Sequence, residues 1–416
     1  MAAFLQPIIS LIWKQIETMI SSIRQAFNQK FTQEAYRNYI KDLEDVYPGQ
    51  LDFRVAETPI FIPKDFTQKM LDACDAILDQ VTTEEYRRQS DKAIPAQLNV
   101  PGQDEYPHCI AFDFGICINE ENNLEPQLIE MQGFPTLFAW EAVIPEIYEK
   151  HFWCPEGYSV YLNGFDKTSY IDLLKRVIVG ETPVENVVLL EIFPEKQKTR
   201  VDFSATEDLL GIRAVCLTQL IQEGKDLYYL RDGVKTKIER IYNRLIFDDL
   251  FQQTPDVQEK GKIMLQELNV KWIPHPNWFY RLSKFSLPFV KHPYVPETKF
   301  LNEVKELPAD LENYVVKPLF SFAGQGVIID VTKEQIENIP DPENWIIQRK
   351  VKYASVIETP DESAKAEIRL FYFWEPGAKR PIAANNLARL SKGKMVGVRY
   401  NKDKSWVGGT FCLFEQ

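Results

Sequence analysis

The chain has 416 residues and a net charge of −12 at neutral pH, and 45% of its residues are hydrophobic. A length prior of about 150 residues per domain predicts two or three domains, and this apolar content excludes a disordered chain. The negative charge disfavours nucleic acid and anionic membranes as partners, so small molecules are the expected ligands. Six cysteines without a Cys-x-x-Cys pair and four scattered histidines provide neither a disulfide framework nor a zinc site, which indicates reduced thiols in a cytoplasmic protein.

The N-terminal region is predicted to be helical. Apolar residues recur at helical spacing from Phe4 to Phe27, which indicates an amphipathic helix. Lys14, Glu17 and Arg24 interrupt the apolar sequence, so neither a membrane span nor a secretory signal is expected. We expect this helix to pack on the body of the protein or on a second copy of the chain, in a homodimer, with a membrane-surface helix as a minor alternative. Helical periodicity continues from Gln33 to Gln89.

Strand signals follow, first in a hairpin and then in an α/β segment. Two apolar runs, Ile110–Ile118 and Pro126–Gln132, are joined by a turn-rich stretch, which predicts a β-hairpin. Helix and strand signals alternate from residue 166 to residue 270, which predicts a small Rossmann-like unit. Thr199–Asp202 and Arg240–Arg244 place polar groups at its expected strand ends, where α/β domains bind ligands. Ordinary surface charge is the competing interpretation for both.

The segment Asn313–Asp330 is typical of a phosphate-binding site. It predicts a buried strand that ends near Lys317, a loop of small residues, and a second β-branched strand. A lysine supplies a point charge, and Gly324 and Gly326 let backbone N–H groups approach phosphate oxygens. The chain contains neither the P-loop nor the dinucleotide-binding glycine motif. A plain hairpin with a glycine-containing turn is the alternative. Later strands are expected at 345–351, 366–374, 381–388, 395–400 and 409–414.

The order of the C-terminal motifs resembles the ATP-grasp superfamily. Lys317 and its glycine loop are followed by a hinge-like strand, an acidic-x-arginine strand at Glu367 and Arg369, a strand with Arg389, and a Gly-Gly loop at 408–409. The Glu-x-Asn metal pair that commonly comes next is absent there.

Counterparts of the missing metal ligands lie upstream. Glu130-Met131-Gln132 resembles the Glu-x-Asn segment of the circularly permuted branch that contains glutathionylspermidine synthase and eukaryotic glutathione synthetase. Asp113 resembles a further acidic ligand of that branch, and Ser283-Lys284 is similar to its first ATP lysine.

The resemblance implies an α/β (α+β) protein with an ATP-grasp fold, an inserted Rossmann-like domain and an N-terminal helical segment. The expected divisions are 1–100 for the helical region, 101–165 with 271–416 for the ATP-grasp core, and 166–270 for the substrate-binding insert. The expected ATP-binding residues are Lys284, Lys317, Ser321, Ala323, Gly324, Gln325, Gly326, Gln348, Lys350 and Val351. Mg²⁺ is expected on Asp113, Glu130 and Gln132, and catalysis is expected from Arg369 and Arg389, with Thr136 and Asn386 as weaker candidates for orienting the substrate. Each charged member also has a structural alternative, as a salt-bridge partner or a strand-end surface charge.

The implied reaction is ATP- and Mg²⁺-dependent C–N ligation of a small-molecule or peptide carboxylate to an amine through an acyl phosphate, releasing ADP. Three departures put catalysis in doubt: Gln132 replaces the usual Asn, Ala111 replaces an arginine, and Ser321-Phe322-Ala323 replaces a charged pair. Spermidine and glutathione specificity are therefore not carried over. An ATP-grasp phosphotransferase and a non-catalytic nucleotide-binding or assembly module stay open as alternatives.

Overall fold

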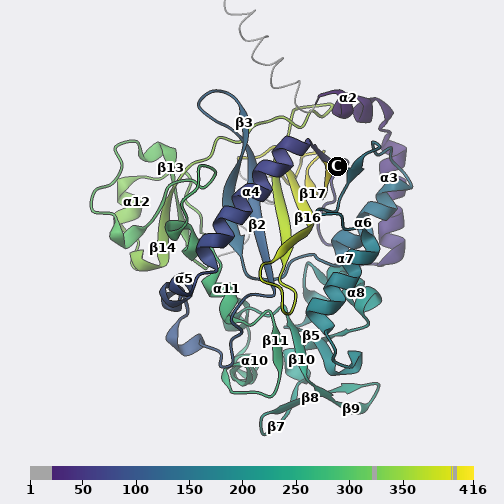
Figure 1. The fold of residues 1–416 in the computed structure, drawn as a ribbon, viewed down its shortest axis with the longest axis vertical. Coiled ribbons are helices and arrows are strands. Elements are labelled where there is room, and N and C mark those ends of the chain that lie inside the picture. Colours follow the sequence, from purple (N-terminus) through teal and green to yellow (C-terminus); the bar gives the residue numbers. More distant parts are fainter. Residues whose placement is uncertain (1–20, 321–325, 395, 397–400) are drawn as a thin grey trace, which may run out of the picture.

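The computed structural model describes residues 21–320, 326–394, 396 and 401–416, and it shows a mixed α/β protein with several sheets (Figure 1). The predicted helix at Phe4–Phe27 lies mostly outside these residues. Its described part belongs to α2 (Ser21–Lys30), which is followed by α3 (Gln33–Val46), α4 (Lys64–Val81) and α5 (Glu84–Gln89). Over the described residues, no helix has the length and apolar character needed to cross a membrane.

A five-stranded antiparallel sheet forms the centre of the molecule. Its order is β17 (Gly408–Thr410), β16 (Ile382–Ser391), β15 (Lys365–Phe373), β2 (Cys109–Ile118) and β3 (Leu124–Gln132). The predicted hairpin is thereby confirmed as β2 and β3. Because side chains alternate along a strand, Phe112 and Phe114 lie on the face that packs against Met70 and Ile77 of α4. Figure 1 shows α4 lying across β2. The opposite face is left for Asp113 and its neighbours.

The segment predicted as one strand at 409–414 belongs to two sheets. β17 pairs with β16, whereas β18 (Cys412–Glu415) pairs with β1 (Ile60–Ile62) and β4 (Tyr158–Ser159). β1 was not predicted, because it is a strand of only three residues between prolines. The expected strand at 395–400 falls almost wholly on residues that the structure does not describe.

The insert contains a four-stranded parallel sheet, as predicted. Its order is β11 (Lys271–Ile273), β10 (Arg240–Asn243), β5 (Val187–Glu191) and β6 (Arg213–Cys216). The sheet reaches three residues past position 270 because β11 pairs with β10. Its flanking helices are α7 (Lys167–Leu174), α8 (Arg200–Leu210), α9 (Phe247–Phe251) and α10 (Pro255–Gly261). A second, antiparallel sheet of β7 (Ile221–Glu223), β8 (Asp226–Arg231) and β9 (Val234–Ile238) was not predicted, because its strands are short and largely polar.

A small antiparallel sheet lies beside the central one. It has the order β12 (Thr298–Phe300), β14 (Trp345–Arg349) and β13 (Tyr314–Pro318), with α12 (Lys333–Glu337) nearby. The second strand expected after the glycine loop is wrong: a single bridge joins Val316 to Ile328. Two backbone hydrogen bonds, of 3.0 and 2.9 Å, make this bridge. The chain turns at Gly326, whose φ of 73° is available to glycine at little cost.

Candidate functional site

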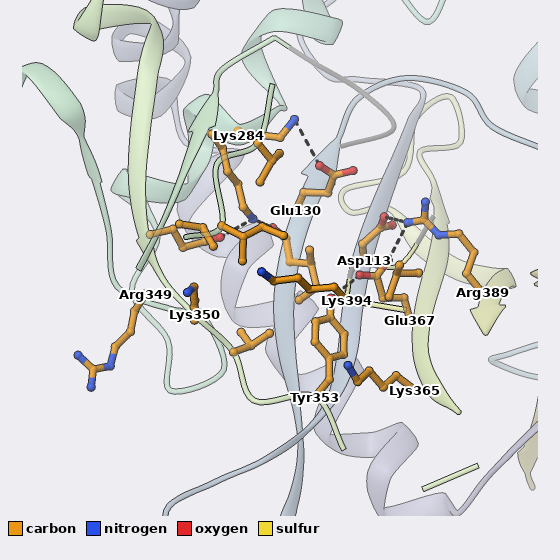
Figure 2. A pocket seen from close by; sticks show the side chains of 18 residues that line it. Asp113, Glu130, Lys284, Arg349, Lys350, Tyr353, Lys365, Glu367, Arg389 and Lys394 are labelled. Carbon is orange, nitrogen blue, oxygen red and sulfur yellow. Dashed lines mark hydrogen bonds and ion pairs between the residues drawn. The ribbon is translucent and has the colours of Figure 1, made fainter. Parts of the chain in front are cut away.

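A cavity of about 310 Å³ lies between the central sheet and the small sheet (Figure 2). Its volume falls in the range of roughly 300–1,000 Å³ that ligand pockets occupy. Figure 2 shows Lys284 and Glu130 at one end of the cavity and Tyr353 and Lys365 at the other. The apolar part of its lining consists of Ile129, Val315, Val327, Ile329, Val351 and Val396.

The cavity is basic although the chain is acidic. Of the described residues that line it, seven are basic and three are acidic, an excess of four positive charges in a chain of net charge −12. The basic residues are Lys284, Lys317, Arg349, Lys350, Lys365, Arg389 and Lys394. A pocket lined by one sign of charge concentrates ligands of the opposite sign. The arrangement therefore favours an anionic ligand.

Strand register brings the acidic and basic residues of the central sheet together. Asp113 on β2 lies opposite Glu130 on β3 and opposite Arg369 on β15. Glu367, two residues before Arg369, lies opposite Arg389 on β16. Residues two apart in a strand share a face, so these five side chains lie on one face of the sheet.

Asp113 is held by both predicted catalytic arginines. Its carboxylate is 1% exposed. Nε and Nη2 of Arg369 each donate to it at 2.5 Å, and Nη2 of Arg389 donates at 2.9 Å. Arg389 also pairs with Glu367 at 3.0 Å. Burial lowers the pKa of Arg389, but the charges of Glu367, Asp113 and Glu130 outweigh burial. The pKa therefore lies above its ordinary value, and the guanidinium stays charged.

Glu130 is ionised but loosely held. Its nearest cations are Lys284 at 3.4 Å and Arg369 at 3.8 Å. Burial opposes its ionisation, but the fields of Lys284, Arg369, Arg389 and Lys317 outweigh burial and lower the pKa of Glu130 to about 2. Its carboxylate is 23% exposed and lines the cavity. Glu130 is thus an anion with room for a further ligand.

Lys317 reaches from the small sheet towards the central one. Its Nζ donates to Oε1 of Gln348 at 2.6 Å and to the carbonyl of Ile129 at 3.4 Å. A shift of register between β2 and β3 next to Ile129 marks a β-bulge, a feature common beside functional sites. Burial, together with the charge of Lys284, lowers the pKa of Lys317 to about 8 despite the opposing effect of Glu130. The lysine is therefore charged at neutral pH but close to titration.

Lys284 is positioned by its own local sequence. It begins a short 3₁₀ helix, Lys284–Phe289, and Ser283 caps that helix by accepting a hydrogen bond from the N–H of Phe285 at 3.1 Å. Ser286 completes a capping box with Ser283. The cap fixes the direction in which Lys284 leaves the backbone, towards Glu130 (Figure 2).

The other predicted ligands differ in their placement. Gln348, Lys350 and Val351 line the cavity, as the hinge interpretation requires. Gln132 lies opposite Ala111, and it is not among the described residues of the lining. Ser321, Ala323, Gly324 and Gln325 lie outside the described residues. Gly326 forms the turn described above. Thr136 accepts a hydrogen bond from Nη1 of Arg369 at 3.3 Å.

Two expectations about substrate residues are wrong. Asn386 is fully buried, and its side chain bonds the carbonyls of Val160 and Cys412 and the N–H of Cys412, so it ties strands together. Thr199–Asp202 begins α8 instead of ending a strand.

The polar groups of the insert also have structural partners. Asp202 accepts hydrogen bonds from the N–H groups of Ala139 and Trp140, and it pairs with Arg244 at 3.2 Å. Arg240 donates to backbone carbonyls of residues 177 and 178. These contacts satisfy groups that would otherwise be buried alone, and the two bonds to Asp202 from Ala139 and Trp140 join the insert to the core.

Four polar residues of the described lining were not predicted as site residues from the sequence: Arg349, Tyr353, Lys365 and Lys394. Tyr353 and Lys394 come from segments between strands, and Lys365 begins β15. No spacing or composition signal distinguishes these residues from surface residues. Glu367 was noted only as a salt-bridge partner, yet it lines the cavity as well.

Comparison with known proteins supports the fold assignment. No protein-family model matches the sequence, and no curated protein matches it. Among solved structures, the chain is similar to a glutathione synthetase-like effector from Globodera pallida in its apo form, with a TM-score of 0.56 and 9% sequence identity. The match covers 92% of this chain and 98% of the effector. At this identity the likeness concerns the fold alone: the chain has a glutathione synthetase-like fold.

Proposed function

We propose that the protein is an ATP- and Mg²⁺-dependent carboxylate–amine ligase of the ATP-grasp type. The observation that carries the proposal is the convergence of Lys284, Lys317 and Arg389 on one basic cavity between two sheets. These residues come from three separate segments of the sequence, and a strand pairing alone does not require them to meet. The glutathione synthetase-like fold is consistent with such an enzyme.

The cavity suits a nucleoside triphosphate. Lys284 and Lys317 supply point charges for phosphate oxygens near Glu130, since Lys284 lies 3.4 Å from its carboxylate and Lys317 donates to the carbonyl of the preceding residue, Ile129. The apolar side chains of Val315, Val327 and Val351 offer a surface for a nucleobase. Gln348 is buried and anchored by Thr298 Oγ1 at 3.0 Å, so it holds Lys317 in a fixed direction.

The carboxylates fit Mg²⁺ in part. Mg²⁺ takes oxygen ligands, keeps several waters and often uses one or two carboxylates plus substrate phosphates. Glu130 fits this role because its carboxylate is 23% exposed and lines the cavity, with Lys284 at 3.4 Å and Arg369 at 3.8 Å as its nearest cations. Both oxygens of Asp113 already accept guanidinium hydrogen bonds. Among the described residues, no group of three or more His, Cys, Asp and Glu side chains has the arrangement of a protein-only metal site. When bound, Mg²⁺ neutralises the charge on the transferred phosphoryl group.

The arginines suit the developing charge of an acyl phosphate. Arg389 lines the cavity and is fixed by Asp113 and Glu367, so it needs little reorganisation when a phosphoryl group moves. Arg369 is held by two bonds to Asp113 and one to Thr136. Positioning and electrostatic stabilisation supply most of the catalysis of phosphoryl transfer. In the first step a carboxylate oxygen attacks the γ-phosphorus of ATP and ADP leaves, which forms the acyl phosphate. The amine then attacks the acyl carbon, phosphate leaves and the surplus proton of the amine passes to solvent, so ADP, phosphate and an amide result.

A second candidate is a nucleotide-binding module without catalysis. The engagement of both Asp113 oxygens by arginines favours it, because the described part of the cavity lining then offers no free pair of carboxylates. Such a protein would bind MgATP but release no ADP with any carboxylate and amine.

The test measures MgATP binding by calorimetry and ADP release with a panel of carboxylates and amines, with products identified by mass spectrometry. Lys317→Ala should abolish binding. Lys299→Ala is the matched control, since Lys299 belongs to the same small sheet but is 61% exposed. Binding that is equal in both variants would contradict the site assignment. A phosphorylated product without an amide would identify a phosphotransferase.

A further inference from the structure

Tyr353 lies in the segment that connects β14 of the small sheet to β15 of the central sheet. This segment, residues 350–364, pairs with the end of β2. The N–H of Ile118 donates to the carbonyl of Lys352 at 2.9 Å, and the N–H of Ala354 donates to the carbonyl of Ile116 at 2.9 Å. Backbone hydrogen bonds on both sides of Tyr353 therefore fix it against the central sheet.

Gly115 leaves the space that the Tyr353 ring occupies. A Cβ added to Gly115 would lie 2.7 Å from Cε1 of Tyr353, closer than real Cβ atoms approach other atoms. The φ angle of Gly115 is not in the left-handed region, so the backbone does not by itself require glycine here. A Cβ there would also crowd Sγ of Cys117 at 3.2 Å and Cδ1 of Ile129 at 3.3 Å, but the Tyr353 ring is its nearest obstacle.

The hydroxyl of Tyr353 starts a chain of polar contacts that ends at Arg389. It donates to Oε1 of Glu367, while Oε2 of Glu367 accepts from Nη2 of Arg389 at 3.0 Å. Arg389 in turn reaches Asp113 at 2.9 Å. The Glu367 side chain is only 8% exposed, and each of its oxygens has its own partner. The carboxylate of Glu367 is thus held from both sides.

We propose that Tyr353 and Glu367 form a positioning relay that sets the guanidinium of Arg389 in the cavity. Tyr353 fixes the rotation of the Glu367 carboxylate, and Glu367 fixes Arg389. The terminal torsion of a glutamate is broad, so loss of the tyrosine hydroxyl frees the carboxylate to turn. Because backbone hydrogen bonds fix Tyr353 against β2, the relay holds the arginine relative to the central sheet. That Arg389 meets a phosphoryl group rests on the proposed function, whereas the relay itself does not.

The first experiment needs no ligand. Phenylglyoxal modifies accessible arginines, and peptide mass spectrometry gives the rate at each one. In Tyr353→Phe and in Glu367→Gln, we expect modification of Arg389 to rise roughly fivefold to tenfold, because each variant loses or weakens one hydrogen bond of the chain that orients the guanidinium. Arg369, held by Asp113, should keep its rate. Tyr229→Phe is the matched control, since that hydroxyl donates to the carbonyl of Glu185 in the insert.

A double variant separates a relay from two independent effects. In the variant that combines Tyr353→Phe with Glu367→Gln, Arg389 should be modified no faster than in Glu367→Gln alone, because the tyrosine acts through the glutamate. Additive rates would overturn the relay. An unchanged rate at Arg389, or an equal rise at Arg369 and Arg389, would overturn it as well.

The second experiment connects the relay to the ligand. With MgATP, Tyr353→Phe should weaken binding roughly fivefold to tenfold, while binding of adenosine should be unchanged, because the relay acts on the phosphate end. An equal loss with both ligands would show that Tyr353 contacts the nucleoside, and it would overturn the relay. If the wild-type protein binds no MgATP, the proposed function fails, while the labelling rates still decide the relay.

Discussion

The Asp113→Asn substitution should loosen the central sheet at β2 and β15. Asp113 is 1% exposed, and it accepts three charge-assisted hydrogen bonds, two of 2.5 Å from Arg369 and one of 2.9 Å from Arg389. Removing one partner of a buried ion pair costs about 3–5 kcal/mol. Arg389 keeps Glu367 at 3.0 Å as a partner, so we expect the lower end of that range, about 3 kcal/mol.

A chain of this length unfolds in more than one step, so a local measurement is needed. Hydrogen–deuterium exchange of peptides that cover β2 and β15 should accelerate roughly a hundredfold, since about 1.4 kcal/mol corresponds to a factor of ten. Peptides from β5 in the insert should be unchanged. Asp45→Asn is the control, because Asp45 is 63% exposed and forms only a surface pair with Lys41. An acceleration below fivefold in β2 would refute the view that Asp113 neutralises both arginines.

Three further outcomes are expected. The pKa of Glu130 is lowered to about 2, so its contribution to stability is fully present above its ordinary pKa of 4.5 and is lost as pH falls towards 2. The local stability of β3 should fall by up to about 3 kcal/mol over this window, and hydrogen–deuterium exchange of β3 peptides in Glu130→Gln should lack that part of the fall. The pKa of Lys317 is lowered to about 8, so the affinity for MgATP should weaken as the lysine loses its charge between pH 7 and pH 9. In Lys317→Arg the side chain stays charged, so the affinity measured by calorimetry should not change over this pH range if Lys317 is the titrating group. Asn386→Ala removes three buried hydrogen bonds and should lower the local free energy of unfolding by about 2–4 kcal/mol, which faster hydrogen–deuterium exchange in β18 would show. Unchanged exchange together with lost ligand binding would instead identify Asn386 as a substrate residue.

Local sequence patterns predicted individual strands better than they predicted which strands pair with one another. Two apolar runs joined by a turn-rich stretch were enough for β2 and β3, and the strand of Lys317 followed from its apolar, β-branched residues. The division of 409–414 between two sheets could not be predicted, because it depends on pairing with β16 on one side and with β1 on the other.

The candidate site shows the same limit. Lys317, Glu130 and Arg389 could be selected by their motif positions, and the structure brings them to one cavity. Tyr353 and Lys394 could not, since their contribution depends on how connecting segments cross the central sheet. Polar groups at 199–202 were misassigned because a helix start and a strand end both favour small polar residues.

The pairing of β2 with β15 has a consequence for folding. Asp113 and Arg369 are 256 positions apart in sequence, and the insert occupies much of the chain between them. Contacts between distant residues slow folding, since a long loop must close before they form. The insert, whose strands pair over shorter distances, can order before the central sheet is complete. The cavity is therefore expected to be among the last parts to assemble during synthesis, and a newly made chain would hold a folded insert before it could hold a nucleotide.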